Sequence, residues 1–263
     1  MRILDKIVNH LKIEIEVLSE SVPIFELEKT KGFDRKCKSL KKSIQNSKSG
    51  IICEFKRRSP SNENINYTSN IKEVVKGYEK AGAVGVSILT NKKFSDGSGI
   101  DIINVRDSLN IPVLKKEFII SEYQIFQAKS FGSDAILLIA SILTKEEILN
   151  FSSLAKSMGL EVLLEVHSGV ELNKIAGNNI DIIGVNNRNL DTLEIDINNS
   201  VELYEMIPDE FVKISESGIS KIKSILKLKE VGFDGFLIGE NFMKTNNPQE
   251  SADNFIKQVE NEI

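Results

Sequence analysis

The chain has 263 residues, and its content of 41% hydrophobic and 27% charged residues is ordinary for a globular protein. The net charge of -4 and the pI near 5.5 exclude a strongly basic surface, which argues against a non-specific nucleic-acid-binding protein. No apolar stretch approaches the roughly 20 residues that a membrane-spanning helix requires, so no membrane segment is expected.

Cysteine and histidine are scarce, which limits the sites that the chain can build. Cys37 and Cys53 lack the spacing of a metal or redox motif, and the opening residues lack the apolar core of a signal peptide. Two histidines, His10 and His167, are too few for a multi-histidine metal site. We therefore expect a reduced, cytoplasmic protein without a multi-histidine metal site.

The first 49 residues are predicted to form a helical extension. Ile3, Ile7 and Leu11 recur at helical spacing and predict an amphipathic helix. Residues 20–49 are polar and irregular, with a possible short helix over 39–44. This segment could be a linker, a lid or a mobile arm, and its lysines are expected to form a solvated surface.

From Gly50 onward, short apolar runs alternate with helical segments. The runs predicted as strands are Ile51–Phe55, Val84–Leu89, Val113–Lys116, Ala135–Ile139, Glu161–Val166, Ile180–Val185, Phe211–Ser215 and Gly235–Ile238. The segments predicted as helices are Asn70–Ala81, Ile100–Ser108, Tyr123–Phe131, Lys145–Met158, Val170–Ala176, Ser200–Met206, Lys221–Val231 and Gln249–Ile263. Several have candidate N-caps, namely Asn70, Thr144, Ser200 and Ser220.

This alternation is the pattern of a (β/α)8 TIM barrel over residues 50–263, preceded by the extension over 1–49, within a single domain over 1–263. The rival α/β architecture is a doubly wound open sheet. It usually has a Gly-x-Gly-x-x-Gly turn after its first strand, and this chain has none there. We therefore favour the barrel.

The first predicted strand ends with two charged residues, Glu54 and Lys56. Residues two apart on a strand face the same way, so both side chains project together into whatever the strand faces. Burying such charges is unfavourable unless they are paired or used. The pair indicates either part of a reaction site or a structural ion pair at the barrel rim.

Other strand ends carry polar side chains in the same pattern, and active sites of TIM barrels lie at these ends. The side chains that alternation directs to one mouth are Glu54, Lys56, Lys116, Glu165, Asn186 and Arg188. Taken singly, Lys116 could be a solvated lysine and 186–188 a polar loop. Their convergence at the strand ends favours an active site.

The last two strand ends, Ser217-Gly218 and Gly239-Glu240, place small residues between a strand and a helix. In many barrels these two loops bind phosphate through backbone N–H groups and a helix N-terminus. Glycine allows an anion close to the backbone, although glycine after a strand also occurs in plain turns.

Two neighbours of these residues have simpler interpretations. Lys115, beside Lys116 on an edge-like strand, is expected to be solvated. His167 follows Glu165 by two residues, but one histidine and one glutamate are too few for a metal site. We expect His167 to pack or to donate a hydrogen bond.

Several blocks in sequence order resemble indole-3-glycerol-phosphate synthase of tryptophan biosynthesis. The resemblance covers nearly the whole chain, and the order of the blocks makes it specific. The blocks are the opening Ile-Leu-Asp-Lys-Ile-Val and residues 51–61, 87–90, 94, 97–98, 112–119, 123–125, 135–140, 164–167, 184–190, 215–219 and 236–240.

The resemblance implies a TIM-barrel lyase that needs no metal. Its reaction closes the indole ring of 1-(2-carboxyphenylamino)-1-deoxyribulose 5-phosphate and releases carbon dioxide and water. The resemblance gives Lys116 the role of general acid and Glu165 that of acid or base in the dehydration. Lys56 would contact the substrate carboxylate and is the second candidate for the proton transfers.

The remaining roles implied by the resemblance concern orientation and binding. Glu54 and Asn186 would orient the substrate and the lysines, and Arg188 would support the anionic end or the framework of the site. The residues implied at the phosphate are Ser59, Ser217, Gly218, Gly239 and Glu240.

The chain departs from the family pattern at two places. Glu117 stands where the family usually has aspartate, which lengthens a side chain beside Lys116. Asn62-Glu63 replaces the usual Lys-Gly after the first strand, which removes a cation and a flexible hinge from that loop.

Two other functions stay open. Another phosphate-binding barrel, such as phosphoribosylanthranilate isomerase, would use a Cys and Asp pair, but Cys53 faces away from Glu54. A catalytically silent barrel would be expected to lack Lys56, Lys116 or Glu165, and all three are present. In either case we expect a small phosphorylated ligand, no nucleic-acid or membrane partner, and a monomer or weak homodimer.

Overall fold

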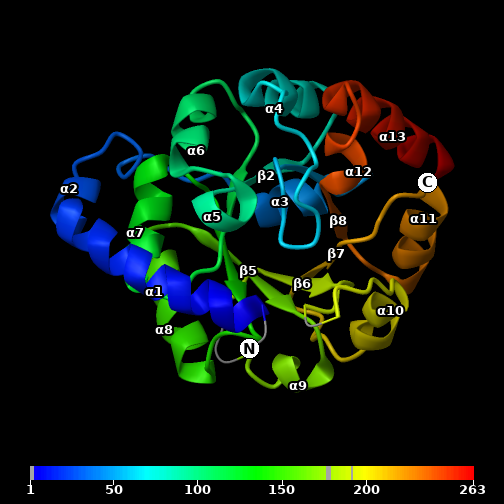
Figure 1. Cartoon of the computed structure of the whole chain (residues 1–263). Helices are drawn as coiled ribbons and strands as arrows, with labels where there is room; N and C mark the ends of the chain where they lie inside the picture. The colour runs from blue at the N-terminus through cyan, green and yellow to red at the C-terminus, as the bar shows by residue number, and fades with distance from the viewer. Residues whose placement is uncertain (1–2, 176–178, 191) are drawn as a thin grey trace.

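The computed structural model describes residues 3–175, 179–190 and 192–263, and its eight strands form one closed parallel barrel in sequence order (Figure 1). The strands are β1 (Ile51–Phe55), β2 (Gly85–Leu89), β3 (Val113–Lys116), β4 (Ala135–Ile139), β5 (Glu161–Val166), β6 (Ile182–Asn186), β7 (Val212–Glu216) and β8 (Gly235–Ile238). The predicted TIM barrel is therefore confirmed.

Helices surround the barrel, and the chain begins with three of them (Figure 1). The helices are α1 (Ile3–Ser21), α2 (Ile24–Leu27), α3 (Leu40–Gln45), α4 (Ile71–Lys80), α5 (Lys92–Ser95), α6 (Gly99–Arg106), α7 (Glu122–Phe131), α8 (Lys145–Ser157), α9 (Gly169–Leu172), α10 (Asn198–Tyr204), α11 (Ile222–Val231), α12 (Glu240–Met243) and α13 (Pro248–Glu262).

The predicted bounds of β1, β3, β4, β5 and β8 match the structure at both ends, while the other three strands are shifted by one or two residues at an end. Asn70 and Thr144 are confirmed as N-caps, since both side chains accept backbone hydrogen bonds. The predictions of Ser200 and Ser220 as N-caps were wrong. Ser200 lies inside α10, and Lys221 is the residue that precedes α11. The predicted helix end at Ala176 lies outside the described residues.

Side-chain alternation divides the core into two layers. One face of the strands fills the barrel with apolar residues such as Ile52, Leu114, Leu163 and Ile214. The other face packs against the helices, and Cys53 lies in that outer layer. The residues two positions after these inner apolar residues face the same way, so they point into the mouth of the barrel.

The prediction that Lys115 is solvated is wrong. Only 2% of Lys115 is exposed, because β3 has neighbours on both sides in the closed barrel and is not an edge strand. Lys115 faces outward from the barrel, where burial lowers the pKa of its ammonium group.

The segment after α1 closes the amino end of the barrel. Leu40 and Ile44 of α3 are fully buried and pack against the inner apolar layer. Ser39 and the backbone of Lys41 donate to the Glu161 carboxylate at the start of β5. Of the alternatives for residues 20–49, the packed structure excludes a mobile arm over 38–45.

Three aspartates make the same type of hydrogen bond at the amino end of the barrel. Asp134, Asp181 and Asp234 stand directly before β4, β6 and β8. Each carboxylate accepts a backbone N–H from the first or second residue of the preceding odd-numbered strand, at Val113, Val162 and Lys213, over 2.8, 2.9 and 2.8 Å. These bonds satisfy donors that the parallel ladder leaves free.

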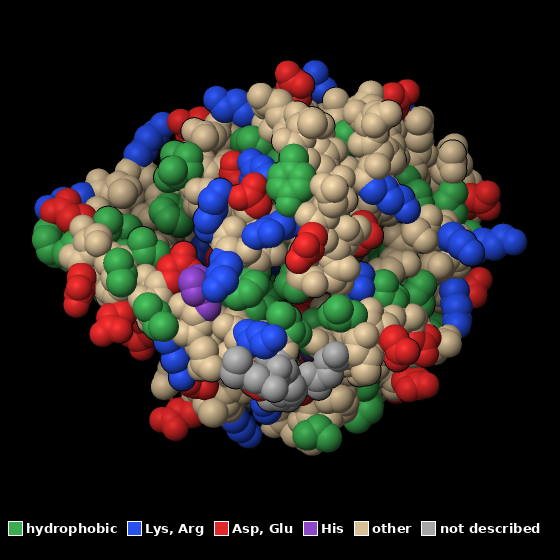
Figure 2. Space-filling model, in the orientation of Figure 1, with side chains coloured by type: hydrophobic (Ala, Val, Ile, Leu, Met, Phe, Trp, Pro, Cys, Tyr) green, Lys and Arg blue, Asp and Glu red, His purple; other side chains and the backbone are tan. Residues whose placement is uncertain are grey.

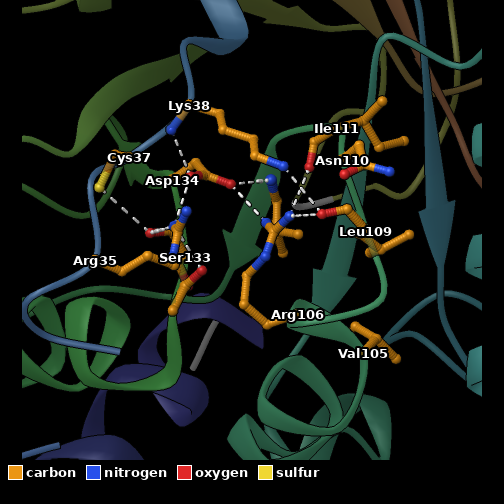
Figure 3. A network of polar contacts seen from close by, with 12 residues as sticks. Arg35, Cys37, Lys38, Val105, Arg106, Leu109, Asn110, Ile111, Ser133 and Asp134 are labelled. Atoms are coloured by element: carbon orange, nitrogen blue, oxygen red, sulfur yellow. Dashed lines mark hydrogen bonds and ion pairs between the residues drawn. The ribbon is translucent and has the colours of Figure 1, made fainter. Parts of the chain in front are cut away.

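Asp134 also holds the extension to the barrel (Figure 3). Its carboxylate is fully buried and accepts hydrogen bonds from Arg35 and the Lys38 backbone at 2.6 and 2.7 Å, and from Arg106 at 2.7 Å. The Arg106 guanidinium also donates to the Leu109 carbonyl. One carboxylate therefore joins residues 35–38, α6 and β3.

We expect Asp134→Asn to lower the free energy of unfolding by about 3–5 kcal/mol, because it leaves the buried Arg106 guanidinium without a counter-charge. Urea denaturation would measure this loss. Asp107→Asn is the matched control, since Asp107 pairs with Lys31 on the surface and should contribute little. Equal stability of the two variants would contradict the role assigned to Asp134.

Candidate active site

A cavity of about 380 Å³ opens at the carboxyl ends of the strands. Figure 2 views this end and shows lysine and arginine side chains beside hydrophobic ones around its centre. All the side chains and glycines that the sequence assigned to a site line this one cavity: Glu54, Lys56, Ser59, Lys116, Glu165, Asn186, Arg188, Ser217, Gly218, Gly239 and Glu240.

Lys116 is the centre of the charged cluster. Its Nζ lies 2.8 Å from Glu165 Oε2 and 3.2 Å from Glu216 Oε2. The other oxygen of Glu165 accepts a 3.1 Å hydrogen bond from the Asn186 side chain. Both carboxylates are almost fully buried, so the three charges interact with little screening.

Glu54 and Lys56 form a second ion pair in the same cavity, with 2.8 Å between Lys56 Nζ and Glu54 Oε1. Ser87 on β2 donates a long hydrogen bond to the other Glu54 oxygen. Gly239 lies against Glu54, where a Cβ on residue 239 would collide with the carboxylate. This glycine therefore makes room for the pair.

The environment moves the pKa values within the cluster in opposite directions. Burial disfavours the charge on Lys116, but Glu165 and Glu216 together raise the pKa of its ammonium above the ordinary value. Burial likewise opposes ionisation of Glu165, but Lys116 lowers the pKa of that carboxyl. At neutral pH this pair is therefore an ammonium and a carboxylate.

The pKa of the Glu216 carboxyl is shifted in the other direction from that of Glu165. Glu216 was not among the predicted site residues. Burial and the nearby Glu165 carboxylate raise its pKa to about 7, in spite of Lys116. Glu216 Oε1 is buried without a hydrogen-bond partner among the described residues. Its position two residues after Ile214, which faces the barrel interior, could have identified it by alternation.

Arg188 lies near the loops after β7 and β8, which the sequence predicts to bind phosphate. Its Nη2 lies 3.9 Å from Glu240 Oε2, and Asn62 donates a 3.1 Å hydrogen bond to Glu240 Oε1. Ser217 and Gly218 both have left-handed backbone, with φ of 68° and 75°. Both residues line the cavity, and their positive φ values end the strand.

The cavity also has an apolar wall that the sequence analysis did not predict. Leu137 and Ile139 from β4 and Ile195 from the loop after β6 contribute to it. Helix α1, shown in blue in Figure 1, adds Leu4 and Ile7. The extension therefore lines the site with α1 and closes the opposite barrel end with α3.

The two departures from the family pattern are accommodated by polar contacts. Glu117 is buried and accepts hydrogen bonds from Thr90 and Asn91 at 2.9 and 3.2 Å, while burial raises its pKa. Asn62 occupies the loop after β1 and contacts Glu240. Both substitutions thus keep defined partners at the rim of the cavity.

Neither a metal-binding cluster nor a membrane-spanning helix is found among residues 3–175, 179–190 and 192–263. No group of three or more histidine, cysteine, aspartate or glutamate side chains is arranged to hold a metal ion. Within the same residues, no helix has the length and apolar character needed to cross a membrane.

A TIM barrel with buried lysine–carboxylate pairs at the carboxyl ends of its strands is typical of an enzyme. A family model described as indole-3-glycerol phosphate synthase matches residues 4–257. The chain belongs to the indole-3-glycerol phosphate synthase family. It is therefore a decarboxylating lyase of tryptophan biosynthesis, as the sequence predicted.

Individual relatives agree with this family. The chain is 43% identical over 258 residues to indole-3-glycerol phosphate synthase of Bacteroides thetaiotaomicron, covering 98% of this chain and 99% of that protein. It is 40% identical over 257 residues to that of Caldanaerobacter subterraneus subsp. tengcongensis, covering 98% of both chains.

Among solved structures, the tryptophan synthase subunit alpha of Legionella pneumophila superposes with a TM-score of 0.62. The match covers 85% of this chain and 98% of that one at 15% sequence identity. At this identity the likeness concerns the barrel fold alone.

The raised pKa of Glu216 predicts a pH-dependent stability. Between its ordinary pKa of 4.5 and about 7, the folded chain keeps a proton that the unfolded chain releases, so this group's contribution falls as pH rises. Relative to the unaltered chain, Glu216→Gln should gain up to about 3 kcal/mol in unfolding free energy from about pH 5 to pH 8.

Urea denaturation at the two pH values measures this gain. Glu202→Gln is the matched control, because it removes an exposed carboxylate on α10 that has no contact with the Lys116 cluster and should keep the pH dependence of the unaltered chain. An equal gain with Glu202→Gln, or no gain with Glu216→Gln, would contradict the role assigned to Glu216.

Proposed function

We propose that the cavity binds 1-(2-carboxyphenylamino)-1-deoxyribulose 5-phosphate and closes its indole ring with release of carbon dioxide and water. The observation that carries this proposal is the Lys116–Glu165–Glu216 cluster, which is buried at the strand ends of a family member. The two carboxylates keep Lys116 protonated in spite of its burial, so a proton donor is present in the site at neutral pH.

The two ends of the cavity suit the two ends of this substrate. The apolar wall with Leu137 and Ile139 suits an aromatic ring, and the turn at Ser217–Gly218 offers backbone donors to a phosphate. Ser59, Gly239 and Glu240 border the same end, where α12 begins. The substrate would thus lie across the mouth, with its reacting carbons near Lys116.

In this arrangement, Lys116 protonates the substrate carbonyl oxygen as the aromatic carbon attacks the carbonyl carbon. Lys56 lies in the same cavity and is placed to bind the substrate carboxylate. Its ammonium is already paired with Glu54, which holds the lysine side chain in position. Lys56 remains the second candidate for proton transfer.

Glu165 serves as acid or base in the dehydration that follows. Asn186 donates to Glu165 Oε1 and accepts from the Arg188 backbone N–H at 2.9 Å, so it fixes the orientation of the carboxylate. The Arg188 side chain donates to the Leu193 carbonyl and approaches Glu240, which supports a role in the framework near the phosphate.

Several broader properties belong to the same proposal. The substrate is a small phosphorylated molecule, and the reaction uses side chains of this chain without a metal or other cofactor. The protein acts in the cytoplasm as one domain over 1–263, in a monomer or weak homodimer, with no nucleic-acid or membrane partner.

Substitution of Lys116 tests the proposal directly. Incubation of the purified chain with the proposed substrate should produce indole fluorescence, and the absence of tryptophan from the chain removes the competing emission. Lys116→Ala should lower kcat by about 100-fold or more, because it removes the general acid. Lys257→Ala, an exposed lysine paired with Asp253, is the control and should behave as the unaltered chain.

The outcomes separate the two lysines. Turnover that survives in Lys116→Ala but is lost in Lys56→Ala would keep the reaction and move the acid to Lys56. Absence of turnover by the folded, unaltered chain would overturn the proposed reaction.

A further inference from the structure

His167 connects the active site to a second cavity. It follows the last residue of β5, and its Nε2 lies 3.4 Å from Glu165 Oε1. On its other side, Nδ1 lies 3.4 Å from Glu171 Oε2 on α9. The imidazole ring is thus placed between the active-site carboxylate and a carboxylate outside the barrel.

Neither nitrogen of this ring is used elsewhere. Both are buried and lack a hydrogen-bond partner of good geometry within the described part of the chain. The distance of 3.4 Å to each carboxylate is slightly longer than an ordinary hydrogen bond and closes with a small rotation of the ring. Glu171 Oε2 also accepts the His167 backbone N–H at 2.8 Å, which holds this carboxylate beside the ring.

The second cavity, of about 460 Å³, lies on the far side of this histidine. It is lined by His167 and Glu171 but not by Glu165, and Asn186 and Arg188 belong to the walls of both cavities. The exposed fraction of the side chain rises along the row, from 3% for Glu165 to 12% for His167 and 16% for Glu171. Lys116 itself is 16% exposed, toward the first cavity. Once substrate fills that cavity, the row gives Lys116 a route to solvent through the second one.

The proposed reaction creates a need for such a row. A carbon–carbon bond forms as the carbonyl oxygen takes up one proton, and the carboxylate leaves as neutral carbon dioxide. The new hydroxyl takes up a second proton and leaves as water, while the carbon beside the nitrogen loses one proton. Each turnover of the carboxylate form therefore takes up one net proton from outside the site.

We propose that His167 delivers this proton, receiving it at Nδ1 from Glu171 and passing it from Nε2 through Glu165 to Lys116. The inference rests on the proposed function. Because His167 faces Glu165 Oε1 and Lys116 faces Oε2, the protonated Glu165 carboxyl group rotates between the two transfers. The last transfer then crosses the contact that is now the 2.8 Å ion pair with Lys116 Nζ, and it restores the lysine to its acid form. His167 acts through Glu165 and is a positioning residue, without contact to the substrate.

The charges around the ring favour this role. The carboxylates of Glu165 on β5, Glu171 on α9 and Glu216 on β7 act on it directly. Burial lowers the pKa of His167, but Glu171 and Glu165 outweigh this effect and raise it above the ordinary value. The other charged groups of the second cavity are Arg188, Glu194, Asp196 and Glu202.

The test measures steady-state kinetics of His167→Gln and Glu171→Gln. We expect kcat to fall about 10-fold in both while KM changes less than about twofold, because proton delivery and not binding is impaired. The kcat of both variants should then rise with the concentration of added imidazole buffer. The kcat of the unaltered chain should not change with that concentration. Glu202→Gln, which removes a carboxylate from the same cavity wall without a contact to His167, is the matched control.

A second readout does not depend on activity. The chain has only two histidines, so an NMR titration resolves His167 once a His10→Gln variant has assigned the signals. Glu165→Gln and Glu171→Gln should each lower the pKa of His167, and Glu202→Gln should leave it nearly unchanged.

The outcomes distinguish the relay from the proposed function. Turnover by His167→Gln with the kcat, pH profile and buffer independence of the unaltered chain would overturn the relay alone. If the pKa of His167 is unchanged in both Glu165→Gln and Glu171→Gln, the relay is also overturned. No turnover by the unaltered chain would overturn the proposed function, and the relay with it.

Discussion

The ion pair between Lys116 and Glu165 is the interaction on which the rest of the site depends. A lysine at the end of a buried strand is stable there only because two carboxylates, Glu165 and Glu216, face it from β5 and β7. The three side chains come from strands that lie apart in the sequence, so closure of the barrel is what creates the cluster. Burial and the nearby Glu165 raise the pKa of Glu216 to about 7, because one lysine does not neutralise two buried carboxylates.

The barrel separates stability from chemistry at its two ends. At the amino end, Asp134 has every lone pair of its carboxylate engaged with Arg35, Arg106 and backbone N–H groups, so it fixes structure and performs no reaction. At the carboxyl end, Glu216 Oε1 and both nitrogens of His167 lack good hydrogen-bond partners among the described residues. Unsatisfied polar groups are unfavourable, and such groups beside a cavity at the strand ends are typical of a site that satisfies them with substrate or transferred protons.

The N-terminal extension serves both ends. Helix α1 contributes Leu4 and Ile7 to the apolar wall of the site, and α3 closes the barrel floor with Leu40 and Ile44. The segment between them is held by the Asp134 network, so the position of α1 over the mouth is coupled to contacts at the amino end. Tyr123 on α7 adds a further tie by donating to the carbonyl oxygen of Leu18 at the end of α1.

The sequence by itself determined the barrel and the residues that face its mouth, because strand alternation and strand order are local patterns that the closed sheet preserves. It therefore placed Lys116 and Glu165 at the mouth. The same alternation, counted from Ile214, would also have identified Glu216, which the prediction left out. The tertiary structure alone decided the burial of Lys115, the apolar wall from α1 and the contacts of His167. These depend on which distant segments pack together, and the spacing of residues along the chain carries no information about such pairings.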